Sequence, residues 1–119
     1  MNWRRQCLVA AGASGAMAFA FAAYAAHGLD GKAADWAGKA SLYQLIHAVV
    51  LLGFANGKSE GLWLKIASVF FVAGIVLFSG TLYVMALTEV KASFIVPFGG
   101  FSFIAGWLCV LAAAAKKGG

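Results

Sequence analysis

Four long apolar stretches that contain no Asp, Glu, Lys or Arg divide the chain, over residues 7–26, 40–56, 66–87 and 92–115. An α-helix rises about 1.5 Å per residue, so roughly 20 apolar residues cross a hydrocarbon layer about 30 Å thick. Three stretches have that length by themselves, and the second reaches it when the turn that follows Asp35, a predicted N-cap, is added. The pattern therefore predicts four spanning helices, over about residues 6–27, 35–56, 64–88 and 92–115.

Composition supports a lipid environment and excludes an ordinary soluble fold. Hydrophobic residues make up 63% of the 119 residues, against about 45 to 50% in soluble domains, and only 11% are charged. All nine Lys and Arg lie at or between the ends of the stretches, where they avoid the cost of inserting a cation into hydrocarbon. The connections are short, so consecutive helices must be antiparallel neighbours. We predict an all-α integral membrane four-helix bundle, up-down-up-down, in a single domain over residues 1–119.

The basic residues also predict the orientation of the chain. Six lie on the side of the termini and three on the other, so the positive-inside rule places both termini in the cytoplasm. An alanine-rich first span and basic termini suit a bacterial cell inner membrane. The net charge of +5 does not indicate nucleic acid, because the basic residues are scattered and form no stripe. The six are Arg4, Arg5, Lys58, Lys65, Lys116 and Lys117, and the three are Lys32, Lys39 and Lys91.

The N-terminus has a second interpretation, as a secretory signal. Residues 1–6 are basic, an apolar run follows, and Ala23, Tyr24 and Ala25 resemble a small-residue cleavage site. The apolar run is long for a signal core, which favours a retained first span.

Small residues recur at helical spacing in three of the spans. Lipid tails are as apolar as leucine, so hydrophobic burial does not drive helix association in a bilayer and close backbone contact must contribute. We therefore expect packing contacts at Gly12, Ala16 and Ala20 in the first span, at Ala67, Gly74, Gly80, Thr81 and Thr88 in the third, and at Ser102 and Gly106 in the fourth.

Pro97, followed by Gly99 and Gly100, is the strongest local irregularity. Proline lacks the amide donor of a helix and clashes with the carbonyl group four residues before it. Two geometries fit: a kinked fourth helix that begins near Ser93, or an extended segment over residues 94–96 with the helix starting at Pro97. The irregularity serves either as a packing kink or as a broken-helix binding site of the kind that transporters use.

Six polar side chains are predicted to gather in the outer half of the membrane, where ionisable groups are rare and often functional. We expect them to hydrogen-bond and to lock the helices together. The alternative is that the two histidines bind haem or a metal, or relay protons, although helical rise separates their depths by about 10 Å. The six are His27, Tyr43, Gln44, His47, Tyr83 and Glu89.

No catalytic or metal-binding signature accompanies these residues. The chain contains no CxxC pair, HExxH, P-loop or serine elbow, so we predict no catalytic residues, no metal site and no cofactor. Cys7 and Cys109 lie near the cytoplasmic ends of their spans, where a reducing compartment does not favour a disulfide. We interpret both as small apolar core residues.

Several segments resemble one known family in their order and spacing. They are Ala25 to Leu29, Tyr43 to Ala48, Phe78 to Tyr83, and Pro97 to Gly100 with Gly106 and Trp107. These segments are similar to domain of unknown function family 423 (DUF423), which groups small bacterial inner-membrane proteins and resembles the eukaryotic transmembrane protein 256. The resemblance implies a four-helix membrane protein without an established activity, and it supplies no catalytic residues.

Three functions from different classes are compatible with these observations. The first is a structural or accessory protein whose helices pack against a second copy or a larger membrane complex, with membrane lipid and other membrane helices as partners. The second is an oligomeric element for passage of protons or a small solute, which would use the polar residues and Pro97. The third is a haem-binding or metal-binding redox element that uses His27 and His47. Short loops offer a partner little besides helix faces, so we expect the first and predict that the protein is not an enzyme.

Overall fold

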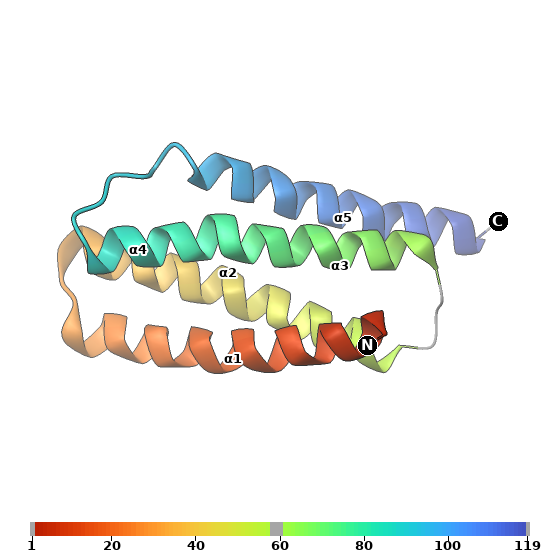
Figure 1. Cartoon of the computed structure of the whole chain (residues 1–119), viewed down its shortest axis with the longest axis horizontal. Helices are drawn as coiled ribbons and strands as arrows, with labels where there is room; N and C mark the ends of the chain where they lie inside the picture. The colour runs from red at the N-terminus through yellow and green to blue at the C-terminus, as the bar shows by residue number, and fades with distance from the viewer. Residues whose placement is uncertain (1, 58–60, 119) are drawn as a thin grey trace.

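Every regular element in the computed structural model, which describes residues 2–57 and 61–118, is helical. The helices form four rods in a bundle whose long axis extends 49 Å. Figure 1 shows the rods running along this axis, with both ends of the chain at the same end of the bundle. The third rod is continuous and contains a π-helical segment, η1, between two α-helices. The elements are α1 (Trp3–Gly28), α2 (Gly31–Asn56), α3 (Leu62–Gly74), η1 (Ile75–Gly80), α4 (Thr81–Leu87) and α5 (Val96–Gly118).

Length and composition qualify all four rods as membrane spans, with 26 residues in each of the first three and 21 in the fourth. This confirms the predicted all-α, up-down-up-down membrane bundle. Two pairs pack most closely, α1 with α2 and α3 with α5. Helix α2 also contacts η1 and α4, so it connects the two pairs.

The start of α2 differs from the prediction. Helix α2 begins at Gly31 with Asp30 in the N-cap position, so Asp35 lies inside the helix and is not its N-cap. Leu29 and Asp30 alone connect α1 with α2. Such a tight reversal needs an unusual backbone conformation. Gly31 adopts one, with a φ of 59°, a left-handed value that favours glycine. The second span therefore starts as soon as the chain has turned.

Pro97 lies at the start of the fourth helix and does not kink it. Residues 93–95 form a turn in which the amide of Val96 donates to the carbonyl oxygen of Ser93 at 3.2 Å, and α5 begins at Val96. Pro97 therefore lies in the first turn, where its missing donor costs little because first-turn amides have no intrahelical acceptor. Of the two predicted geometries the structure shows the helix start, with a turn in place of an extended segment. The alternative of a kinked helix from Ser93 does not occur.

The π-helical segment η1 was not predicted from the sequence. A π-turn places an extra residue in one turn of a helix and is frequent at functional sites. On the side of α5, a Cβ atom added to Gly99 would collide with the backbone nitrogen of Phe78 and would lie 2.8 Å from the carbonyl carbon of Leu77. On the side of α2, the fully buried Ser79 donates to the carbonyl oxygen of Ala40 at 2.8 Å. Segment η1 therefore contacts both neighbouring helices through its backbone and one hydroxyl.

Gly74 and Gly106, two of the residues expected at packing contacts, lie where α3 and α5 meet. A Cβ atom added to Gly74 would collide with the ring of Phe103, and one added to Gly106 would lie 2.5 Å from the ring of Phe71. Each glycine therefore makes room for an aromatic ring of the opposite helix. By contrast, a Cβ atom on Gly80 or Gly100 would meet no neighbouring helix; the nearest atom to Gly80 is a carbonyl oxygen of η1 itself at 3.8 Å.

Within the single chain, α1 packs through a different face from the one that carries Gly12, Ala16 and Ala20. Gly12, Ala16 and Ala20 are exposed, and an added Cβ at Gly12 would have open space around it. The face that α1 turns toward the bundle contains Cys7, Ala11, Ser14, Ala18 and Ala25. Cys7 and Cys109 are both free and buried, and they belong to one apolar cluster together with Leu51, Phe71 and Phe103.

Candidate functional site

Two side-chain hydrogen bonds join α2 to the helices on either side of it near mid-span. The hydroxyl of Tyr83 in α4 donates to Gln44 Oε1 at 2.6 Å, and the indole Nε1 of Trp107 in α5 donates to His47 Nε2 at 3.2 Å. Gln44 and His47 are three residues apart, so they share one face of α2. Ala40, whose carbonyl oxygen accepts from the hydroxyl of Ser79 in η1, lies one turn earlier on the same face. Polar contacts between the helices are therefore concentrated on one buried face of α2.

His47 is buried, and both of its ring nitrogens are engaged. Its Nδ1 lies 2.7 Å from the carbonyl oxygen of Tyr43, and its Nε2 accepts from Trp107. A carbonyl oxygen only accepts and an indole N–H only donates, so the ring proton is on Nδ1. The ring also stacks on Phe103, with centroids 3.9 Å apart, and is tilted against Phe71. This arrangement links α2 to α5 through side chains and leaves neither nitrogen of His47 free for a ligand.

The structure brings only some of the predicted polar cluster together. Gln44, His47 and Tyr83 are buried in the bundle, whereas Tyr43 is 40% exposed and contributes its backbone carbonyl. His27 and Glu89 are exposed, and neither makes a hydrogen bond or ring contact within the described residues. The two histidines therefore form no shared site. Trp107, the partner of His47, was not predicted for this role.

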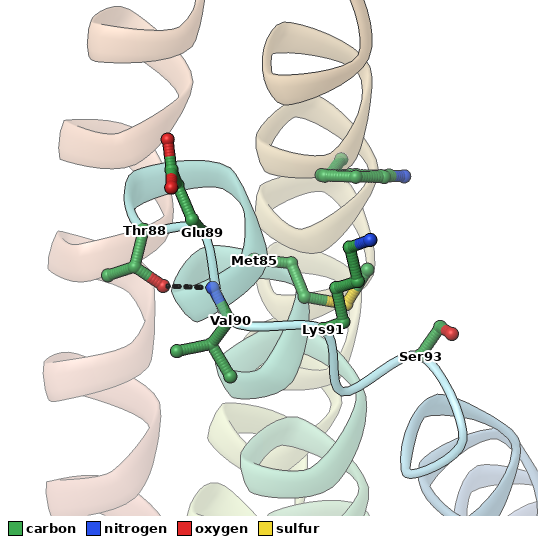
Figure 2. Close-up of a pocket in the computed structure, with 7 residues that line it drawn as sticks. Met85, Thr88, Glu89, Val90, Lys91 and Ser93 are labelled. Atoms are coloured by element: carbon green, nitrogen blue, oxygen red, sulfur yellow. Dashed lines mark hydrogen bonds between the residues drawn. The ribbon is translucent and has the colours of Figure 1, made fainter.

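A cavity of about 530 Å³ lies beside the connection between α4 and α5 (Figure 2). Thr88 orders this connection, because its hydroxyl donates to Val84 O at 2.6 Å and accepts from the amide of Val90 at 3.2 Å. The cavity is open and contains charged side chains from the loop. Its lining consists of Trp36, Met85, Thr88, Glu89, Val90, Lys91 and Ser93.

A second cavity, of about 280 Å³, lies at membrane depth between α1 and the third rod, which scarcely touch each other. We call it the α1–η1 cavity. It borders a further cavity of about 420 Å³ toward the start of α1, because Ala10 and Val72 line both. The α1–η1 cavity is lined by Ala10, Ser14, Met17, Gln44, Val72, Ile75, Val76, Gly80 and Tyr83. Sequence analysis selected Gln44 and Tyr83 but did not reveal this cavity, because the spacing of residues does not show where two helices separate.

Metal ligands do not gather anywhere in the part of the chain that the structure describes. No group of three or more His, Cys, Asp or Glu residues is placed to hold an ion there. The side chains that make the three hydrogen bonds between α2 and its neighbours are two hydroxyls, one amide, one imidazole and one indole.

The fold and its buried contacts define a small helical protein of the membrane. A family model described as "Protein of unknown function (DUF423)" matches residues 21–100. That is more than half of the chain, and the protein belongs to this family. No solved structure matches the chain.

Relatives from several bacteria support the assignment. The UPF0382 inner membrane protein YgdD of Escherichia coli K12 is 35% identical over 94% of this chain and 91% of its own length. The UPF0382 membrane protein SAB0533 of Staphylococcus aureus is 38% identical over 87% of this chain and 89% of its own, and the UPF0382 membrane protein SERP0230 of Staphylococcus epidermidis is 40% identical over the same shares. Neither the family description nor these names state an enzymatic activity.

Proposed function

We propose that this protein is a non-catalytic accessory component of the membrane that associates with a further transmembrane helix through the outward face of α1. The further helix belongs to a second copy of the chain or to a larger membrane complex. We also propose that the protein resides in a bacterial inner membrane with both termini in the cytoplasm, as its basic residues and the name of its Escherichia coli relative suggest.

The composition of the outward face of α1 is the observation on which the proposal rests. This face is exposed in the single chain, and apart from the bulky Phe19 its central turns present small residues: Gly12, Ala13, Ala16, Ala20 and Ala23. Small residues at intervals of four let two helix backbones approach closely, and they are the usual composition of helix contacts in membranes. Lipid alone would not require them.

Helix α5 provides the contrast within the same molecule. Its exposed face is bulky, with side chains more than half exposed at Phe98, Phe101, Ile104, Leu108 and Leu111. Such a face suits lipid tails. A shallow apolar groove of about 200 Å³ between α1 and α2 borders Gly12 and Gly15, which gives a partner helix a recess beside the small residues. The outward face of α1 therefore suits a partner helix, whereas the exposed face of α5 suits lipid.

The size of the protein after mild solubilisation from its native membrane tests the proposal. We expect the wild type to run as a complex, and Gly12→Leu with Ala16→Leu to run as the 12.4 kDa chain. Gly53→Leu is the matched control, because Gly53 is an exposed helical glycine on α2 with equally open space around its Cβ position. A wild type that is a lone monomer under every mild condition, or a double variant that keeps the complex, would overturn the proposal.

A further inference from the structure

Two buried donors without partners border the α1–η1 cavity. Ser14 is 8% exposed, and its hydroxyl makes no hydrogen bond to any residue that the structure describes. Gln44 is 2% exposed; its Oε1 accepts from Tyr83, whereas its Nε2 has no partner among the same residues. Every fully enclosed side-chain nitrogen or oxygen in the described residues has a hydrogen-bond partner. Because these two groups have none, each must be partly accessible. The free ends of both groups are therefore directed at the space that they line.

Depth makes these donors costly as long as they have no partner. Ser14 lies about 16 Å of helical rise from Trp3, near the middle of a hydrocarbon layer about 30 Å thick. An amide or hydroxyl without a partner in such a medium is unfavourable, because it has lost its hydrogen bonds to water and nothing replaces them. The remaining lining is aliphatic apart from Met17 and Tyr83, so ordered water has few other groups to bind.

We propose that the α1–η1 cavity binds a membrane-soluble quinone, whose ring carbonyl oxygens accept hydrogen bonds from Gln44 Nε2 and the Ser14 hydroxyl. The ligand needs an acceptor oxygen that reaches mid-membrane on an otherwise apolar body. Phospholipid esters lie at the interface and do not meet this need. A quinone ring fits the volume of about 280 Å³, and the adjoining cavity of about 420 Å³ accepts the first part of an isoprenoid tail.

This ligand site is distinct from the association proposed above, because it uses other residues of α1. The cavity is lined by Ala10, Ser14 and Met17 of α1, whereas the association uses the exposed small residues. Failure of one proposal therefore leaves the other in place. The proposal concerns binding and includes no electron transfer.

Binding of a decyl-substituted benzoquinone to the full chain in nanodiscs of defined phospholipid tests the inference. We expect saturable binding by the wild type and a shift of its thermal unfolding to higher temperature. Decylbenzene has the same apolar body without carbonyl oxygens, and we expect it to bind at least about tenfold more weakly, a difference of 1.4 kcal/mol. Equal binding of the two probes would overturn the proposal, as would the absence of saturable quinone binding.

Variants identify the donors. We expect Gln44→Leu to weaken quinone binding about tenfold and Ser14→Ala by about threefold to tenfold, as the loss of one buried hydrogen bond predicts. Ser41→Ala is the matched control, because the Ser41 hydroxyl is satisfied within its own helix by Gly38 O at 2.9 Å. Ala10→Leu fills the space between the two cavities without removing a hydrogen bond and keeps the test decisive if Gln44→Leu does not fold. Wild-type affinity in both Ser14→Ala and Ala10→Leu would refute the site.

Discussion

The adjacent glycines at the start of α5 provide a sharp test of how the bundle is packed. Gly99→Ala would place a methyl group against η1, where it would collide with the backbone nitrogen of Phe78 and lie 2.7 Å from the Phe78 Cβ, against 3.4 Å for an ordinary contact. Gly100→Ala would place the same group in open space. Both positions lie in the same turn of α5, so the two variants differ mainly in this one contact with η1.

The size of the expected effect depends on which atoms can move to make room for the new methyl group. The neighbours of Gly99 are two backbone atoms and the Phe78 Cβ, whose position the backbone fixes, so α5 itself must shift away from η1. The hydrogen bond from Ser102 to Phe70 O at 2.7 Å is strained by the same shift. Overpacking of this kind costs about 1 to 3 kcal/mol. The helix-propensity gain of alanine over glycine, about 0.5 to 1 kcal/mol, applies to both variants and cancels in the comparison. We therefore expect Gly99→Ala to be less stable than Gly100→Ala by about 1 to 3 kcal/mol.

Thermal unfolding in detergent, followed with a thiol-reactive fluorophore, measures this difference. Cys7 and Cys109 are free and buried, so the dye reacts as the bundle opens. At about 4 °C per kcal/mol, Gly99→Ala should unfold at least about 4 °C below Gly100→Ala. Equal unfolding temperatures would refute the conclusion that close backbone approach at Gly99 holds α5 against η1.

Two further predictions concern the buried polar contacts and the orientation. Tyr83→Phe, which removes the donor to Gln44, should lower the free energy of unfolding by about 0.6 to 1.5 kcal/mol in the same assay. Tyr24→Phe, at an exposed site, should leave the free energy of unfolding unchanged. Equal effects of the two variants would mean that the hydrogen bond contributes nothing to stability. A reporter that works only in the cytoplasm should be active when fused after Gly119, and an inactive fusion would reverse the proposed orientation.

The sequence was informative about spans and less so about their ends. Apolar length alone predicted four helices, because a membrane span must satisfy its own backbone hydrogen bonds. The start of α2 was missed, since Asp35 and Asp30 are both acceptable N-caps and only the tight turn at Gly31 distinguishes them. At Pro97 the sequence left two geometries open for the same reason: the local residues permit both, and the position of the preceding loop selects one.

Partners of the buried polar groups were harder to predict. Gln44, His47 and Tyr83 were selected because polar residues are rare in spans, and all three are buried. Their partners depend on contacts far apart in the chain: Trp107 is 60 residues from His47, and Tyr83 is 39 residues from Gln44. His27 and Glu89 were included by depth along the chain. His27 remains outside because depth does not determine on which side of a helix a residue lies, and Glu89 because it lies in the connection that follows α4.

The amino-acid sequence by itself determined that this chain is a four-span membrane protein, because the length of each apolar run must match the bilayer. Only the tertiary structure decided which face of each helix packs. A span that is apolar all round has no amphipathic face that a pattern could reveal, so the choice of Ala11 over Gly12 in α1 depends on the surfaces of neighbouring helices. The same contacts shape η1 and open the α1–η1 cavity, where Ser14 and Gln44 meet from different helices.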